Sequence, residues 1–201
     1  YALRNDTLGS SSAAYNVAVG ANAGVAVTTG TANTLIGGLA GDAITTGSNN
    51  ASVGKGSMGA NTTGGANVAL GVDALLSNTT GDANTAVGYG ALDANTTANN
   101  NTAVGNSALG ANTTGTTNTA VGYAALDANT TAGSNTAVGS SALGATTTGA
   151  NNTAVGANSL LVNTTGLDNV AVGNLALTAN TTASYGTAVG KSALAANTTG
   201  A

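Results

Sequence analysis

The sequence predicts an all-β fold, a parallel β-solenoid (a β-roll or β-helix) in which each 17-residue row forms one coil. Three observations support this prediction. Cut every seventeen residues from Asn16 onward, residues 16–201 give eleven rows without an insertion or deletion. Each column of this alignment keeps its own chemistry, as expected when like residues stack on like residues. Within a row, segments such as "NTAVG" (118–122) alternate with a period of two, which is typical of a strand.

Two aliphatic columns are the predicted core ladder. The fourth column is always aliphatic and is always followed by glycine, and the ninth holds Leu or Met from the third row onward. We expect both columns to point inward. The fourth column contains Val19, Ile36, Val53, Leu70, Val87, Val104, Val121, Val138, Val155, Val172 and Val189, and the ninth contains Met58, Leu75, Leu92, Leu109, Leu126, Leu143, Leu160, Leu177 and Leu194.

Other arrangements of the row fit the residues poorly. Val, Thr, Gly and Asn are weak helix formers, and the chain has no Asn-Gly or Asp-Gly dipeptide for tight hairpins. With strands stacked about 4.8 Å apart, eleven coils give a rod of roughly 50 Å. A second strand is expected over "ALDAN" (91–95), with corners at "TTG" and at the glycine after the fourth column.

The twelfth column raises a question of register. In the first two rows the ninth column is glycine, and Val27 and Ile44 occupy the twelfth column, which is mostly Asn in later rows. We therefore expect the Asn column to face inward as well, as a hydrogen-bonded ladder.

Composition excludes several classes of function. The net charge is −4 with only three cationic residues, so no basic patch for nucleic acid exists. Asn and Thr interrupt every apolar run, so no membrane span is expected. The chain has no His, Cys or Glu, and its aspartates form no dyad. We expect a protein that is not an enzyme, with no catalytic residue, metal or cofactor.

Three binding or modification hypotheses remain open. Calcium-binding β-rolls use Gly-Gly-x-Gly-x-Asp repeats, which are absent here. The Asn-Thr-Thr copies fit glycosylation acceptors or, preferably, stacked corners; they begin at Asn61, Asn78, Asn95, Asn112, Asn129, Asn163, Asn180 and Asn197. Regular outward Thr ranks would suit an ice-binding protein, although adjacent Thr residues of a strand face opposite ways.

Contacts with partners are expected at a few exposed residues and at the ends of the rod. Tyr89, Tyr123, Leu161 and Leu167 are the candidate contact residues. Residues 1–15 fall out of register and are a candidate cap or inter-subunit contact, and the last coil is a candidate site for head-to-tail stacking because strand edges invite pairing.

The segments "NTAVG", "NVAVG" and "NVALG" followed by "xxAL" resemble the head repeats of YadA-like trimeric autotransporter adhesins. They are also similar to "TGxxNTAVGxxAL" arrays of surface and tail-fibre-like proteins. The resemblance covers residues 16–201 and implies a left-handed β-roll, a trimer, and attachment at the cell surface or outside the cell. We therefore expect an extracellular structural or adhesive fibre protein that self-associates as a trimer or a head-to-tail filament, with an unknown surface receptor; ice binding is the alternative.

Overall fold

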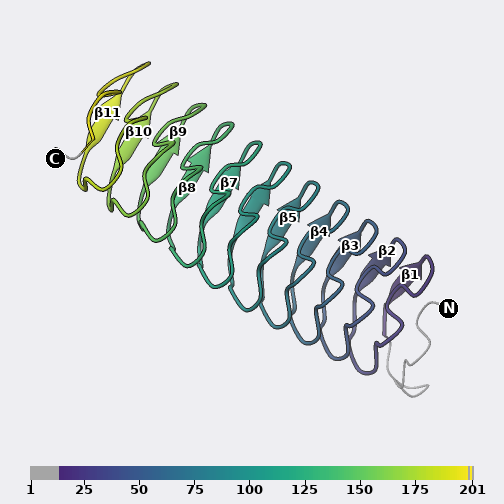
Figure 1. The fold of residues 1–201 in the computed structure, drawn as a ribbon. Helices are drawn as coiled ribbons and strands as arrows, with labels where there is room; N and C mark the ends of the chain where they lie inside the picture. The colour runs from purple at the N-terminus through teal and green to yellow at the C-terminus, as the bar shows by residue number, and fades with distance from the viewer. Residues whose placement is uncertain (1–13, 199, 201) are drawn as a thin grey trace.

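The computed structural model, which describes residues 14–198 and 200, is an all-β parallel solenoid (Figure 1). The described residues form one sheet of eleven short strands stacked in sequence order, with the first and last strands at opposite ends of the rod. The predicted fold class is confirmed. Most of the out-of-register segment 1–15 lies outside the described residues. The strands are β1 (Val17–Val19), β2 (Thr34–Ile36), β3 (Ala51–Val53), β4 (Val68–Leu70), β5 (Thr85–Val87), β6 (Thr102–Val104), β7 (Thr119–Val121), β8 (Thr136–Val138), β9 (Thr153–Val155), β10 (Val170–Val172) and β11 (Thr187–Val189).

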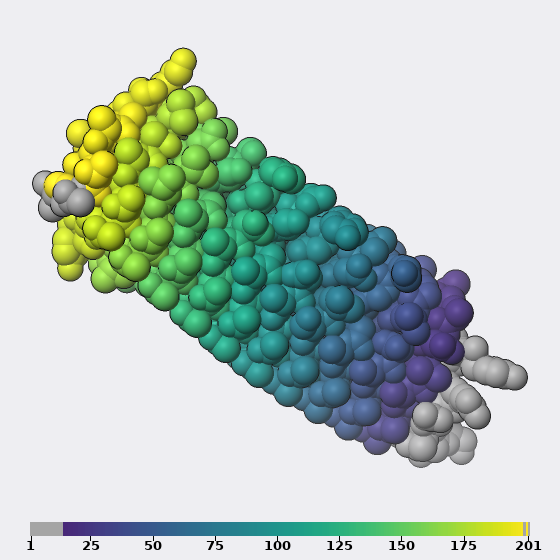
Figure 2. All heavy atoms as spheres, viewed as in Figure 1, coloured from purple at the N-terminus to yellow at the C-terminus, as the bar shows by residue number. Residues whose placement is uncertain are grey.

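Each coil is bonded to the next at an offset of seventeen residues. In the sheet, Ala86 of β5 pairs with Ala103 of β6. The offset continues beyond the strands, where the Thr79 N–H donates to the Thr96 carbonyl over 2.8 Å. An insertion in one row would break this register for every column at once. On the face drawn in Figure 2, successive coils pack into a continuous rod.

The prediction that the fourth column lies in the core is wrong. The alanine of the third column points inward and is fully buried in most coils, so the flanking residues of the three-residue strand point outward. In most coils the ninth-column leucine already fills much of the interior, and the small alanine takes the inward place of the strand. The outward, exposed or half-buried residues are Val19, Ile36, Val53, Leu70, Val87, Val104, Val121, Val138, Val155, Val172 and Val189.

The ninth column does lie in the core. Its members Met58, Leu75, Leu92, Leu109, Leu126, Leu143, Leu160 and Leu177 are fully buried, whereas Leu194 in the last coil is 55% exposed. They pack with buried alanines of the third and eighth columns, such as Ala103 and Ala108. One large side chain per coil is therefore the main apolar content of the interior.

The predicted second strand is also wrong. The segment 91–95 and its copies form turns, and the buried leucines have left-handed backbone, as at Leu109 with φ +53°. This conformation costs about 1–2 kcal/mol for an L-residue. Burial of a leucine contributes about 1.5–3 kcal/mol and offsets it.

The twelfth column forms the predicted internal Asn ladder. The amide of Asn78 donates to the side-chain oxygen of Asn61 over 2.9 Å, and Asn95 donates to Asn78 over 2.8 Å. Each amide also donates to a carbonyl three residues on, as from Asn78 to Gly81 over 3.0 Å. These side chains are fully buried. Their hydrogen bonds therefore offset the free-energy cost of removing the amide groups from water.

A second Asn ladder runs along the first column. The side-chain oxygen of Asn84 accepts the backbone N–H of Asn101 over 3.0 Å, and the amide of Asn101 donates to the Gly115 carbonyl over 2.8 Å. The twelfth-column Asn112 donates to the same Gly115 carbonyl over 3.0 Å. The two ladders thus meet at the fifteenth column and close each coil.

The first two coils fill the interior differently. Ile44 and Leu35 occupy the space that the ninth-column leucine takes elsewhere, and a Cβ on Gly41 would lie 2.7 Å from Ile44 Cδ1. Val27 is buried in the corresponding place of the first coil. Apolar side chains of other columns therefore fill the space that the ninth-column glycine leaves in these two coils.

Thr146 interrupts the twelfth-column ladder. Its hydroxyl donates to the Asn163 carbonyl over 3.0 Å, and the buried side-chain oxygen of Asn129 in the preceding coil is left without a partner. Thr146→Asn supplies an amide that can donate to the side-chain oxygen of Asn129. It should raise the free energy of unfolding by about 1 kcal/mol. Urea unfolding followed by circular dichroism measures the change.

The matched control is Asn112→Thr, which breaks the same ladder at another coil. The amide of Asn112 donates to the side-chain oxygen of Asn95 over 3.2 Å, and threonine removes this hydrogen bond. It should lower the free energy of unfolding by about 1–3 kcal/mol. A loss of stability in Thr146→Asn would contradict this role of the ladder.

The glycine after each strand is required for close stacking of coils. Gly122 has φ +139°, and a Cβ there would lie 2.6 Å from the Gly139 carbonyl carbon of the next coil. Gly122→Ala should lower the free energy of unfolding by at least about 2 kcal/mol. Gly38 has ordinary backbone and open space, so Gly38→Ala should be neutral or stabilising by up to about 1 kcal/mol. Equal midpoints for the two variants in a thermal melt would refute this requirement.

Candidate interaction surfaces

The outer face of the sheet is uncharged along the whole rod. It is formed by the second and fourth columns, because the third points into the core. In β5 to β9 and β11 these outward residues are Thr and Val, as in Thr119 and Val121. The first five columns contain no Asp, Lys or Arg in any row. The sheet therefore presents a regular surface of methyl and hydroxyl groups.

The two neighbouring threonine columns have different roles. In the thirteenth column the hydroxyl bonds to the next coil, as from Thr113 to the Thr130 carbonyl over 3.0 Å. The fourteenth column is exposed and forms a single rank along the rod. It contains Thr29, Thr46, Thr63, Thr80, Thr97, Thr114, Thr131, Thr148, Thr165 and Thr182.

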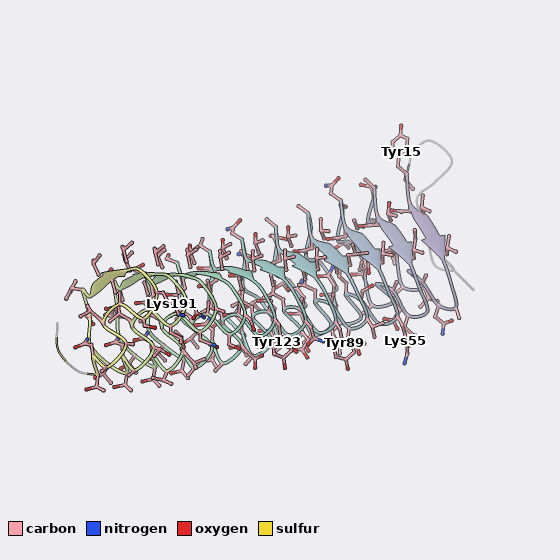
Figure 3. The ribbon with its side chains drawn as sticks, turned by 90° about the horizontal axis from the view of Figure 1, so that it is seen from above. Tyr15, Lys55, Tyr89, Tyr123 and Lys191 are labelled. Atoms are coloured by element: carbon pink, nitrogen blue, oxygen red, sulfur yellow. The ribbon has the colours of Figure 1, made fainter. Side chains whose placement is uncertain are left out.

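The turns after the strands form a second surface, here called the turn face, made of the sixth to eleventh columns. Tyr89 and Tyr123 are 60% and 63% exposed and two coils apart. Together with Lys55 they project from the edge of the rod away from Tyr15 (Figure 3). The described aspartates of the tenth column, Asp42, Asp93 and Asp127, belong to the same face.

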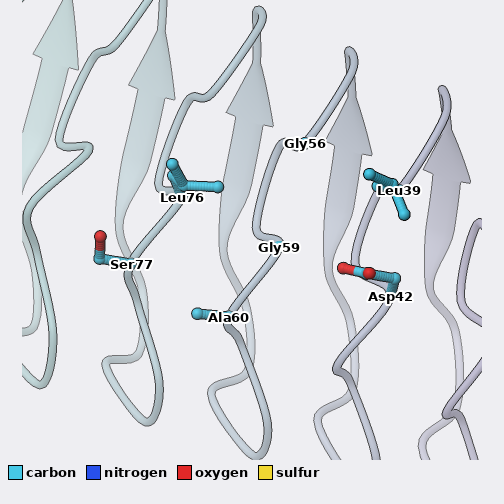
Figure 4. Close-up of a pocket in the computed structure, with 7 residues that line it drawn as sticks. All are labelled: Leu39, Asp42, Gly56, Gly59, Ala60, Leu76 and Ser77. Carbon is cyan, nitrogen blue, oxygen red and sulfur yellow. The ribbon is translucent and has the colours of Figure 1, made fainter.

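Two hollows lie on the turn face. The first, of about 400 Å³, is lined by Asp42, Gly59 and Leu76, with Leu39, Gly56, Ala60 and Ser77 (Figure 4). The second, of about 460 Å³, is lined by Asp127, Gly144 and Leu161, with Ala124, Ala128, Ser141, Ala145 and Val162. Leu161 is thus a lining residue, whereas Leu167 is exposed on a different column and is not part of the hollow. Sequence reasoning missed both hollows, although the repeated order Asp, Gly, Leu down the tenth column could have indicated them.

The carboxyls of the turn face are partly desolvated. Burial raises the pKa of Asp42 and of Asp127. It also raises the pKa of Asp93, to which the negative charges of Asp127 and Asp73 add a smaller effect. Deprotonation of these three groups is therefore less favourable in the folded than in the unfolded chain.

The described residues do not offer the arrangements needed for glycosylation of the Asn column, for metal binding by aspartates or for a membrane-spanning helix. Asn61, Asn78 and their buried copies donate to carbonyls or to one another, so the folded chain does not present their amides to a glycosylating enzyme. Among the described residues no three Asp side chains come together in a group that could hold a metal ion. Within 14–198, no helix is long and apolar enough to cross a membrane.

These features define a β-solenoid repeat protein with two distinct surfaces, the sheet face and the turn face. No family model matches the sequence, and neither a curated protein nor a solved structure matches the chain.

Stability should depend on pH through the three shifted aspartates. Because their pKa values are raised in the folded state, the folded chain binds more protons than the unfolded chain in the window just above the ordinary carboxyl pKa of 3.8. The free energy of unfolding should therefore rise as the pH is lowered from 7 to about 4. Urea midpoints across this range measure the effect.

The variant Asp42→Asn, Asp93→Asn, Asp127→Asn removes the titrating groups, so its midpoint should vary less over the same range. A wild-type midpoint that falls steadily between pH 7 and 4 would contradict the assigned direction.

Proposed function

We propose that this chain is a non-catalytic structural shaft of an extracellular attachment fibre, assembled from several copies of itself through the sheet face. The observation that supports the proposal is the uncovered outer face of β1–β11. Purely parallel sheets are normally covered on both faces. Here the interior covers one face, and the other carries exposed aliphatic side chains such as Leu70 and Val138.

The size and regularity of this face favour a second copy as its occupant. Eleven strands about 4.8 Å apart and three residues wide give a face of roughly 500 Å², as large as the largest apolar patch of a typical monomer, which is often functional. Two copies have the same coil spacing, so their ranks of Val and Thr match along the whole length. Strands of the face lack the charge that would oppose such contact.

An attachment role agrees with the resemblance of "NTAVGxxAL" to the head repeats of trimeric adhesins, which are displayed outside the cell. A trimer about the rod axis uses the sheet face, and a head-to-tail filament uses the ends of the rod. In either arrangement Tyr89 and Tyr123 stay exposed on the turn face as contacts for a surface receptor.

A charge on the sheet face should dissociate the assembly. Val121→Lys places an ammonium in the proposed interface without touching the core, and it should shift the wild-type oligomer to a monomer in sedimentation equilibrium. Ser140→Lys adds the same charge at an exposed sixth-column position and should leave the oligomer intact. A monomeric wild-type chain at about 0.1 mM would exclude assembly through this face.

Ice binding is the second candidate function, and one observation favours it. The outward pattern of β5 to β9 is Thr-x-Val, with Thr and Val each repeated at every coil. This arrangement could order water only if the face stays uncovered. If the wild-type chain is monomeric and shows thermal hysteresis that Val121→Lys loses, the result favours ice binding. If the chain is oligomeric and shows no thermal hysteresis, the result favours the fibre.

A further inference from the structure

The first hollow on the turn face is made by a missing side chain. The tenth-column residue of the third coil is Gly59, while the coils on either side carry Asp42 and Leu76. Figure 4 shows Asp42 and Leu39 on one side, Leu76 on the other, and Gly59 between them. The hollow therefore has one acidic wall and one aliphatic wall.

The second hollow repeats this arrangement. Asp127, Gly144 and Leu161 occupy the tenth column of three consecutive coils, each 85 residues after its counterpart. The same order does not arise at Gly110, which has an aspartate on both sides and no aliphatic wall. Two hollows, each with one acidic and one aliphatic wall, thus lie on one face.

The acidic walls have no cationic partner within the described chain. Asp42 is half-buried and Asp127 is exposed, partial burial raises the pKa of both, and no Lys or Arg is among the groups that act on either carboxyl. A cation entering either hollow would therefore meet a carboxylate that has no cationic partner among the described residues. In the first hollow, Asp73 adds negative charge, because a Cβ on Gly56 would lie 2.6 Å from its Oδ1.

The aliphatic walls identify the kind of cation. Leu76 and Leu161 offer apolar surface beside the carboxylate, which suits a charged group carried on a hydrocarbon stem. Lysine has a compact ammonium on a flexible four-carbon stem that buries along apolar surface. Arginine gains most where planar, bidentate contacts or aromatic stacking are available, and no aromatic side chain lines either hollow.

The separation of the hollows is fixed by the fold. They are five coils apart, or about 24 Å at 4.8 Å per coil, and the backbone ladder between coils keeps this spacing rigid. We propose that each hollow binds one lysine side chain of a partner protein, and that a partner with two lysines about 24 Å apart occupies both. This turn-face site is separate from the sheet face, so it does not depend on self-association.

A bivalent peptide tests the proposal. The probe is a fluorescently labelled, end-capped peptide with two lysines joined by eight prolines, which hold their Cα atoms about 28 Å apart. The flexible four-carbon stems of the lysines span the difference from the separation of the hollows. Measured by fluorescence anisotropy, it should bind at least about tenfold more tightly than the same peptide with one lysine, because the second contact is intramolecular. A version with two norleucines keeps the stems without the charge and should not bind.

Variants of the protein locate the binding. Asp42→Asn with Asp127→Asn, and Gly59→Leu with Gly144→Leu, should each abolish the tenfold gain; leucine already occupies this column at Leu76 and Leu161. Asp93→Asn with Asp168→Asn removes the same total charge outside both hollows and should keep affinity within twofold. Circular dichroism checks that all variants fold.

Three results would overturn the proposal. Equal binding of the norleucine peptide would show that charge is not recognised. Equal weakening by Asp93→Asn with Asp168→Asn would show a general electrostatic attraction instead of two sites. No gain from the second lysine would show that the two hollows do not act together.

Discussion

The structure depends on hydrogen bonds that join each coil to the next at a constant offset of seventeen residues. Backbone ladders supply most of them, and two columns of Asn side chains continue the same offset through the interior. With only one large apolar side chain in most coils, the hydrophobic interior is thin, so the repeated polar contacts carry an unusual share of stability. The weak point at Asn129 and Thr146 shows how one substitution in a column leaves a buried acceptor unpaired.

The same constraint decides what the surfaces look like. Because most columns repeat the same residue at each coil, an outward column forms a row of like side chains along the rod. The Val column of the sheet face and the exposed Thr column are two such rows. Residues that depart from the repeat of their column produce local features instead of continuous ranks. The order Asp42, Gly59, Leu76 and its copy five coils later are such features, and so are the two tyrosines of the turn face.

Much of the fold could be predicted from the sequence, since the invariant period fixed the parallel stacking and the inward Asn column. The direction of the strand side chains could not, because alternation in "NTAVG" separates two faces without saying which is inside. The structure places Ala103 inside, beside the buried ninth-column leucine, and leaves Val104 on the outer face. The left-handed backbone of Leu109 was equally hidden, since leucine rarely adopts it and only burial offsets its cost. The hollows depend on the order Asp, Gly, Leu down the tenth column, which shows a hollow only once the turn that carries this column is known to face outward.

Distances between spin labels would test the stacking most directly, and the absence of native cysteine makes the labelling clean. Labels at Thr63 and Thr148, five coils apart on the exposed Thr rank, and at Thr46 and Thr165, seven coils apart, should give narrow distributions near about 24 Å and about 34 Å. A separation that grows by about 4.8 Å per coil is the result expected from vertical stacking. Broad distributions, or equal distances for the two pairs, would contradict it.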